Sequence, residues 1–295
     1  EAGGLIWIYM GPAGTESAMP KLEWLGLPSD HFYITKRYQR CNFLQNVEGE
    51  LDSSHVSYLH SQTSSNAYDD PNKGQRPSYM VTDKSPVFTI AETPYGFAVG
   101  ARRNAEIDTY YWRITQFLMP SYTMIPAPVG GPVSFTGAVP VQDDSMVGFT
   151  VTWHPDRPLN AAEIGQIESW TGIHTEVDPR TFQPLRNKDN DYLIDRAAQK
   201  SWSFTGIRGI REQDLAVQEG MGPIYDRSKE RLGTSDTAII AARRRMLRAI
   251  GALEAGTLPY ELQDGSVYRI RSAALVLPRT VPFLEGARQA LVATA

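Results

Sequence analysis

The chain has 295 residues, which is long enough for a substantial hydrophobic core in one large domain or two. Its formal net charge is −4, and it contains neither a basic tract nor an apolar stretch of membrane-spanning length, so nucleic acid and membranes are not the expected partners. The single cysteine, Cys41, excludes internal disulfides and any four-cysteine cluster. Nothing in the sequence is typical of secretion, and the expected location is cytoplasmic.

The N-terminal part predicts a buried strand, a linker and a second strand. Residues 1–10 pass from a glycine turn into an apolar run, which is typical of a buried strand. Residues 12–30 are rich in Gly, Pro and Ser and indicate a linker. Residues 31–40, HFYITKRYQR, alternate apolar and polar side chains like a half-buried strand. His31 is expected to be a structural side chain at the end of that strand.

Residues 46–60, NVEGELDSSHVSYLH, contain a candidate metal-binding pattern. His55 and His60 lie five positions apart, and Asp52 precedes the first of them by three. Two imidazoles and one distant carboxylate form the facial triad of non-haem Fe(II) enzymes. Residues five apart on a regular helix point about 140° away from each other, so both rings reach one metal only if the helix predicted here bends or bulges. The alternative is a surface His55 and a His60 that stabilises the helix C-terminus as a cation.

Strands dominate the middle of the chain. Residues 61–78 have the composition of a long flexible loop. A hairpin signal, TPYG, follows at 93–96. The expected strands cover residues 87–92, 97–102, 108–119, 133–141 and 146–154. Several strands in succession, with helices before and after them, indicate an α+β domain in which helices pack on one face of an antiparallel sheet.

Arg113 is unusual in the strand 108–119 because its neighbours are apolar. Strict alternation places Tyr111, Arg113, Thr115 and Phe117 on one face of the strand and Trp112, Ile114 and Leu118 on the other. The guanidinium either pairs with an acid at the solvent face or points into a pocket, where its planar fork can hold a carboxylate. Arg113 is therefore a candidate anchor for a substrate carboxylate, and Arg76 and Arg103 are weaker candidates.

The last part of the chain predicts helices joined by irregular segments. His154 ends a strand before two prolines and is expected to be structural. His174 lies in the irregular stretch 172–201 and is expected to be a solvated loop residue. Helices are expected at 161–170, after the cap Asn160, and at 210–221, 234–254 and 281–293. In the third of them Ile239, Ile240, Met246, Leu247, Ile250 and Leu253 form one apolar stripe.

Two segments resemble a known family. The string CNFLQNVEGELDSSHVSYLHSQ, which contains His55 and His60, resembles the iron-binding segment of Rieske non-haem iron oxygenases. The string PIYDRSKERLGTSD at 223–236 resembles the phthalate dioxygenase group of that family, and the similarity extends over nearly the whole chain. The resemblance implies a helix-grip fold of the Bet v1 and START type, with a mononuclear Fe(II) site.

The resemblance also implies the third ligand. The amphipathic run 210–221 would by itself place Glu212, Asp214 and Glu219 on the solvent face of a helix. In the resembled family the third ligand is an aspartate five positions before a glutamate, which is Asp214 here, with Glu212 as the alternative if the register is shifted. Asp52 would accept the N–H of a ligating imidazole and bridge to a Rieske-cluster histidine of the neighbouring subunit, or it would cap the helix that carries the ligands.

The domain organisation implied by the resemblance is that of a catalytic domain without its electron-donating domain. Residues 1–12 resemble the end of a truncated N-terminal Rieske domain, and residues 13–295 resemble the mononuclear iron catalytic domain. A [2Fe-2S] Rieske cluster needs two cysteines and two histidines, so it would lie on the missing domain. Electrons would come from NAD(P)H through a separate reductase, and the full-length protein would form a homotrimer or stacked trimers.

The implied activity is hydroxylation of an aromatic, carboxylated compound with Fe(II) and O₂. The reaction would be cis-dihydroxylation or a monooxygenation such as O-demethylation. Two other functions fit some of the same residues. A helix-grip domain can bind a small apolar ligand without catalysis. A zinc hydrolase could use His55 and His60, but it would need a general-base glutamate within the motif, where Val56 follows the first histidine.

Overall fold

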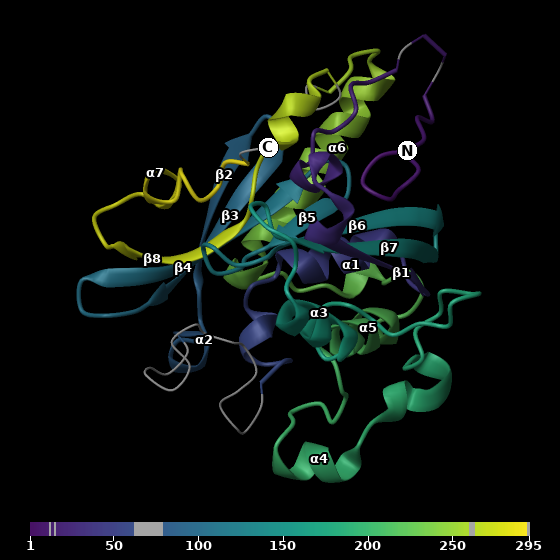
Figure 1. The fold of residues 1–295 in the computed structure, drawn as a ribbon, viewed down its shortest axis with the longest axis vertical. Helices are drawn as coiled ribbons and strands as arrows, with labels where there is room; N and C mark the ends of the chain where they lie inside the picture. Colours follow the sequence, from purple (N-terminus) through teal and green to yellow (C-terminus); the bar gives the residue numbers. More distant parts are fainter. Residues whose placement is uncertain (12, 15, 62–78, 260–262, 294–295) are drawn as a thin grey trace.

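The computed structural model describes residues 1–295 except 12, 15, 62–78, 260–262 and 294–295 (Figure 1). At its centre lies a sheet with eight strands in this described part, and all neighbouring strands in it are antiparallel. The strand order is β1-β7-β6-β5-β4-β3-β2, and β8 pairs with the first part of β4. The strands are β1 (Phe32–Gln39), β2 (Val87–Thr93), β3 (Gly96–Asn104), β4 (Thr109–Leu118), β5 (Tyr122–Ile125), β6 (Val133–Gln142), β7 (Ser145–Trp153) and β8 (Ala273–Pro278).

The predicted strands from residue 31 to residue 154 are confirmed, including the hairpin of β2 and β3. The sequence pattern does not predict β5 and β8, because β5 is too short for a periodic signal and β8, AALVLP, does not alternate. The buried strand expected at 1–10 is wrong: Ile6, Ile8 and Met10 are 79, 74 and 88% exposed. Within the described residues this run pairs with no strand of the sheet, and although Trp7 packs against the core, Ile6, Ile8 and Met10 face away from it.

One face of the sheet carries the long helices. α1 (Phe43–Leu51) and α6 (Thr237–Glu254) pack on it, and α5 (Ile210–Gly220) packs against α1. The core of this layer includes Val47, Leu51, Phe97, Val99, Phe117, Ala138, Met146, Ala238 and Ala242. This arrangement confirms the predicted α+β class and helix-grip architecture, and the layer between sheet and helices positions the site described below.

Shorter helical segments lie around the edges and loops. The α-helices are α2 (Tyr79–Thr82), α3 (Ala161–Glu168), α4 (Arg196–Ser201) and α7 (Phe283–Gly286). The 3-10 helices are η1 (Glu23–Gly26), η2 (Ser29–His31), η3 (His55–Ser57), η4 (Lys188–Leu193), η5 (Arg227–Lys229), η6 (Thr234–Asp236) and η8 (Gly265–Tyr268). Asn160 caps α3 as predicted, since its side chain accepts a hydrogen bond from the N–H of Glu163.

The opposite face of the sheet is also covered, which the sequence pattern does not predict. Trp24 of η1 packs on Phe135 and Trp153, with ring centroids 4.6 and 5.4 Å apart. Near the other end, Phe283 of α7 stacks on Trp112 at 5.0 Å. The helix expected at 281–293 is reduced to the four residues of α7, while the turns that follow it contribute Ala287 and Leu291 to this second layer.

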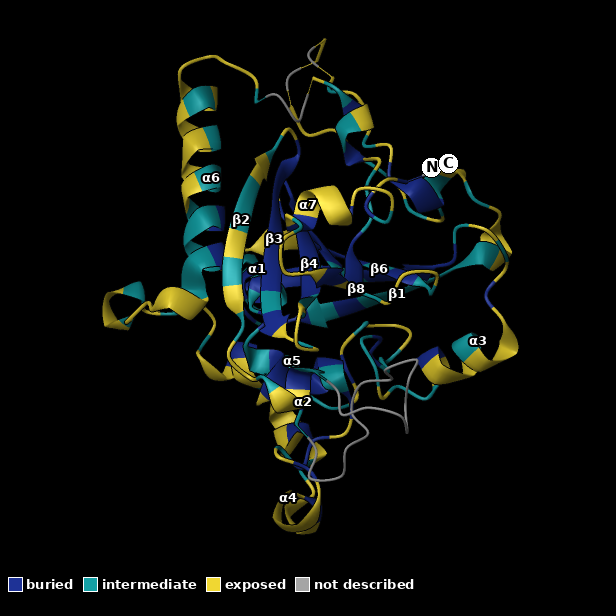
Figure 2. Cartoon of the chain, turned by 90° about the vertical axis from the view of Figure 1, so that its left-hand side faces the viewer, coloured by how far each residue is buried: buried dark blue, intermediate teal, exposed yellow. Residues whose placement is uncertain are grey.

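α6 packs on the sheet mainly through its first half. Ala238 and Ala242 are buried, whereas Leu247, Ile250 and Leu253 are 67, 51 and 49% exposed. Figure 2 shows the helix running beside β2 with a largely exposed outer surface. The predicted apolar stripe therefore packs on the core only in part: Met246 contacts the core, whereas the other three members in the second half of the helix are exposed. Among the described residues, no helix combines the length and the apolar character needed to cross a membrane.

Candidate metal centre

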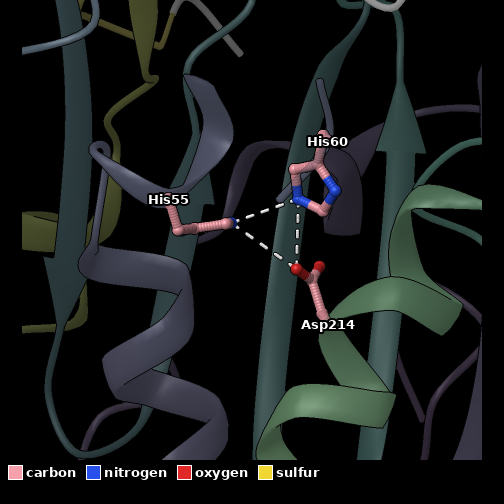
Figure 3. Close-up of side chains that lie close together, drawn as sticks. All are labelled: His55, His60 and Asp214. Atoms are coloured by element: carbon pink, nitrogen blue, oxygen red, sulfur yellow. Dashed lines mark hydrogen bonds and ion pairs between the residues drawn. The ribbon is translucent and has the colours of Figure 1, made fainter. Parts of the chain in front are cut away.

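Three side chains from distant parts of the chain converge in the layer between sheet and helices (Figure 3). Nε2 of His55 lies 3.1 Å from Nε2 of His60 and 3.5 Å from Oδ1 of Asp214. Nε2 of His60 lies 3.1 Å from the same carboxylate oxygen. In the described part of the chain, these residues form a group whose ligand atoms all lie within 4.8 Å of one another.

The separations between the three ligand atoms fit a single metal ion. Ligand atoms about 2.1 Å from a metal are about 3.0 Å apart at right angles and about 3.4 Å apart at the tetrahedral angle. The observed separations of 3.1 to 3.5 Å are each within about 0.1 Å of this range. One divalent cation can therefore contact both imidazoles and the carboxylate with only small adjustments of the side chains.

Neither histidine lies on an α-helix, which corrects the predicted helical segment: His55 is the first residue of a 3-10 helix and His60 lies in the turn that follows it. α1 ends at Leu51, and Asp52 is its C-terminal cap. The 3-10 turn η3 then begins at His55. The carboxylate of Asp52 closes this turn by accepting hydrogen bonds from the N–H groups of Ser54 at 2.7 Å and His55 at 3.2 Å. Because the chain leaves the helix before either ligand, the two rings meet without any helical bulge.

Arg103, a weaker candidate for substrate binding, supports this loop. Its side chain is buried, and burial lowers its pKa to about 10. The guanidinium donates hydrogen bonds to the carbonyl oxygens of Ser53 at 2.7 Å and Asp83 at 3.0 Å. These contacts tie the loop that carries the ligands to β3. The other weak candidate, Arg76, lies outside the described residues.

Both imidazoles are oriented with Nε2 toward the centre of the site. Nδ1 of His55 lies 2.5 Å from the carbonyl oxygen of Asp52, and Nδ1 of His60 lies 2.7 Å from Oε1 of Gln213. Both oxygens can only accept, so each Nδ1 donates to its partner and Nε2 is the ring nitrogen whose proton a metal would displace. Gln213 is fixed in this orientation because its Nε2 donates to the carbonyl oxygen of Ile207 at 2.9 Å.

Two of these supporting contacts differ from the sequence prediction. The carboxylate of Asp52 was the expected acceptor for the N–H of His55, but its Oδ2 lies 3.8 Å from Nδ1 and the backbone carbonyl of Asp52 accepts instead. Gln213 was not predicted at all. The sequence signal that could have indicated Gln213 is its position next to Asp214 on α5. Adjacent residues of a helix point about 100° apart, so their side chains can approach one site from two sides.

The electrostatics of the site favour an ionised Asp214. Burial favours the neutral acid, but the charge of His60 and hydrogen bonds from both histidines outweigh burial and hold the pKa of Asp214 well below its usual range. For His55, burial lowers the pKa, yet the adjacent carboxylate of Asp214 outweighs it and the pKa is raised. A positive charge among these three groups is therefore favourable, and a bound divalent cation would supply it.

An inner cavity of about 60 Å³ lies between the three residues and the sheet. Arg113 and Thr115 of β4 line it together with His55, His60 and Asp214. Arg113 is 7% exposed, and its Nε has no hydrogen-bond partner among the described residues. The predicted alternation of β4 is confirmed, because Phe117 packs in the core with α1 and α6 while Trp112 packs on α7. Arg113 thus offers an unused donor on the same face as the three ligands.

A larger groove of about 310 Å³ adjoins the site on its outer side. Asp52, His55 and Asp214 form part of its wall, and the side chain of Asp52 is 25% exposed. The groove is also lined by a network of charged residues that joins α1, η5 and α6, namely Glu48, Arg227, Glu230 and Arg243. The site can therefore be approached from the surface as well as from the inner cavity.

The acids of α5 are buried, although the amphipathic pattern places them on the solvent face. Glu212 is 1% exposed, and burial raises its pKa to about 8. Glu219 is 3% exposed and accepts hydrogen bonds from the backbone N–H of Arg40 and the hydroxyl of Tyr192. The pattern fails because α1 and η4 pack against α5 from two directions. Glu212, the alternative ligand, is not part of the converging group.

His174 is a buried structural residue, which corrects its expected place in a solvated loop. It is 2% exposed, and its two ring nitrogens lie 2.8 Å from the hydroxyls of Thr35 and Thr152. Burial, together with the charges of Arg211 and Arg37, lowers its pKa to about 3. The imidazole is therefore neutral and joins β1 to β7. His154 is also buried, directly after the last residue of β7. For this residue the predicted structural role agrees with its burial.

Comparisons with known proteins match most of the chain. A family model described as LigXa C-terminal domain like covers residues 8–286. The 3-chlorobenzoate-3,4-dioxygenase oxygenase subunit of Comamonas testosteroni is 32% identical over 295 residues, covering 95% of this chain and 68% of that protein. The phthalate 4,5-dioxygenase oxygenase subunit of Pseudomonas putida is 36% identical over 271 residues, covering 87% of this chain and 59% of that protein. The chain thus corresponds to only part of each relative.

The solved structures that resemble this chain have low sequence identity to it. A structure of Pseudomonas putida CBB5 NdmA, a QL mutant with theobromine, aligns with a TM-score of 0.47 at 12% identity. The alignment covers 90% of this chain and 62% of that chain.

Proposed function

The chain belongs to the family of Rieske-type oxygenase subunits, and on that premise we propose that it is the catalytic domain in which an aromatic, carboxylated compound is hydroxylated with Fe(II) and O₂. The observation that carries the proposal is the convergence of His55, His60 and Asp214. Two imidazoles and one carboxylate on one face of a metal leave the remaining coordination positions open. Iron bound there would supply the oxygen activation.

The residues around the ligands prepare them for this role. The carbonyl of Asp52 and the amide of Gln213 hold the two histidines with Nε2 toward the proposed metal position. Asp214 is ionised and can contribute a negative charge that offsets part of the charge of a divalent cation. Such supporting partners typically change metal affinity by roughly 10- to 100-fold when they are removed.

Arg113 is the proposed anchor for the substrate carboxylate. It lines the inner cavity with an unpartnered Nε, and a buried guanidinium gains most from a bidentate contact with an anion. The names of the two relatives refer to 3-chlorobenzoate and phthalate, which are aromatic carboxylates. Both cis-dihydroxylation and monooxygenation, including O-demethylation, are reactions that such a site can support.

Electron supply to the site is proposed to come from outside these 295 residues. The chain has one cysteine, whereas a [2Fe-2S] Rieske cluster needs two cysteines and two histidines. Residues 13–295 would form the catalytic domain and residues 1–12 the end of a Rieske domain, with NAD(P)H feeding the cluster through a reductase. In a homotrimer or stacked trimers, Asp52 would face the cluster of a neighbouring subunit, since its carboxylate is partly exposed beside the outer groove.

Metal analysis tests the proposal against the two other functions. Separate samples of the chain are incubated anaerobically with Fe(II) alone or Zn(II) alone, because zinc outcompetes Fe(II) at nitrogen and oxygen ligands whatever the function of the site. Each sample is desalted, analysed by mass spectrometry of the metals and assayed for hydrolysis of aryl esters. We expect about one iron per chain, lost in His55→Ala and His60→Ala and kept in the control His31→Ala, which lies outside the cluster. Hydrolysis of aryl esters by the zinc-loaded chain, lost in the same two variants, would favour a hydrolase. Absence of any bound metal would favour a binding module and contradict the proposal.

A further inference from the structure

The two oxygens of Asp214 face different partners. Oδ1 points toward the histidines, 3.1 Å from Nε2 of His60 and 3.5 Å from Nε2 of His55. Oδ2 lies on the other side, 3.5 Å from Nη1 of Arg211, which is one turn earlier on α5. The Asp214 carboxylate therefore lies between the proposed metal position on one side and the positively charged guanidinium of Arg211 on the other.

Arg211 is fixed in place by contacts with two other parts of the structure. It is 1% exposed, and Nη1 makes a short hydrogen bond and ion pair with Glu50, near the end of α1, whose side chain is 4% exposed. Its Nε donates to the carbonyl oxygen of Ile173 at 3.3 Å. Removing this guanidinium would leave Glu50 as an unpaired buried charge, which is costly in free energy.

Arg211 also forms part of the cavity wall beside the ligands. The inner cavity is lined by Glu50 and Arg211 in addition to the three ligand residues. Nη2 of Arg211 has no hydrogen-bond partner among the described residues. The guanidinium, always charged in proteins, thus lies where it acts directly on the position of the Asp214 carboxylate.

From this arrangement we infer that Arg211 is a positioning residue that restricts Asp214 to binding the metal through Oδ1 alone. The inference rests on the proposed metal site. A carboxylate can bind a cation through one oxygen or both, and with both it occupies one more coordination position. By holding Oδ2, Arg211 keeps that position free for an exogenous ligand such as O₂ or water, which a facial triad requires.

Crystal structures of the chain loaded with Co(II) test the inference directly. In the wild-type protein we expect only Oδ1 of Asp214 within bonding distance of the metal. In Arg211→Met we expect both oxygens to bind. The matched control is Arg37→Met, because Arg37 is equally buried but donates to the hydroxyl of Thr150 and makes no ion pair with an acid among the described residues. That control should keep the single-oxygen contact.

A second variant keeps the test decisive if Arg211→Met fails to fold. In Glu50→Gln the guanidinium loses its main anionic partner and pairs more closely with Asp214. We expect the single-oxygen contact to persist while the dissociation constant for Co(II), measured by competition titration, rises roughly tenfold. Tighter binding of Co(II) by Glu50→Gln would overturn the inference.

The outcome for Arg211 can be separated from the outcome for the metal site itself. If the wild-type chain binds no metal, the proposed function fails. If it binds Co(II) through both oxygens of Asp214, or if Arg211→Met keeps the contact through Oδ1 alone, the metal site stands and only the role of Arg211 is refuted.

Discussion

Gln213 links the carbonyl of Ile207 to Nδ1 of His60, so one side-chain amide fixes both the tautomer and the orientation of a ligand. Replacing it with leucine removes the acceptor and leaves the ring free to rotate or change tautomer. We expect Gln213→Leu to weaken Co(II) binding roughly 10- to 100-fold, as measured by titration. The control Gln166→Leu, at an exposed position of α3, should bind Co(II) like the wild type. Equal affinity in both variants would contradict the assigned role.

Arg113 is the side chain on which substrate choice is expected to depend. With a panel of aromatic acids and their uncharged analogues, Arg113→Ala should weaken binding of the carboxylated members roughly 10- to 100-fold, the value of a hydrogen bond to a charged group. The uncharged analogues should bind as before. Calorimetric titration of the Co(II)-loaded chain measures both sets, with Arg102→Ala on the neighbouring strand as control. Unchanged affinity for the acids would exclude Arg113 as the anchor.

His174 makes the stability of the fold depend on pH. Its pKa in the folded chain, about 3, lies below the usual 6.5, chiefly because of burial. Between these values the unfolded chain binds the additional proton, so this residue's contribution to stability is lost as the pH falls.

The pH dependence attributed to His174 can be isolated with one variant. His174→Gln keeps a neutral partner for Thr35 and Thr152 but cannot be protonated. Between pH 7 and pH 5 we expect the wild type to lose about 2 kcal/mol of unfolding free energy relative to this variant. Urea denaturation of the metal-free chain at both pH values gives the difference. Parallel loss in the two proteins would mean that His174 does not stay neutral in the fold.

At the scale of elements, a network of charges joins α1, η5 and α6 beside the outer groove. Glu48 accepts hydrogen bonds from Arg227 at 2.6 Å and from Arg243 at 2.7 Å, and its side chain is 10% exposed. Glu230 pairs with the same two arginines. The network connects α1, which precedes the segment with His55 and His60, to α6, which packs on the sheet. It therefore stabilises the surroundings of the site without contacting the metal ligands.

Glu48→Gln tests the strength of this connection. Loss of the charge leaves two partly buried arginines with weaker partners, and we expect a loss of about 2 kcal/mol in unfolding free energy, measured by urea denaturation. Glu92 also pairs with arginines of α6, but its side chain is 54% exposed. The matched control Glu92→Gln should therefore change stability by less than about 0.5 kcal/mol. Equal losses of unfolding free energy in the two variants would show that burial does not make the ion pairs of Glu48 stronger than the exposed pairs of Glu92.

At the scale of the whole molecule, metal binding should stabilise the fold. His55 and His60 follow α1 while Asp214 lies on α5, so the ligands meet only when the helices are packed on the sheet. A ligand that binds the folded chain alone, at a concentration about 100 times its dissociation constant, adds about 2.7 kcal/mol to the unfolding free energy. Denaturation with and without Co(II) should show this gain, and Asp214→Asn should largely abolish it. An equal gain in that variant would place the metal elsewhere.

The sequence pattern was most informative where the structure depends on residues that are adjacent in the sequence. Alternation along β4 correctly separated the face of Arg113 and Phe117 from that of Trp112, because the period of a strand is local. It failed at the acids of α5 and at the second half of α6. In both places the exposed side of a helix is set by what packs against it. α1 and η4 both contact α5, whereas Leu247, Ile250 and Leu253 of α6 are left exposed.

The residue types of the site were determined by the sequence itself: two histidines close together, an acid far along the chain, and a family resemblance that paired them. Only the tertiary structure brought Asp214 to within 3.5 Å of both rings and placed Gln213, Arg211 and Arg113 around them. The physical reason is that these contacts join segments far apart in the chain. Local patterns can state which groups are available, whereas the packing of the helices on the sheet decides which of them meet and in which protonation state.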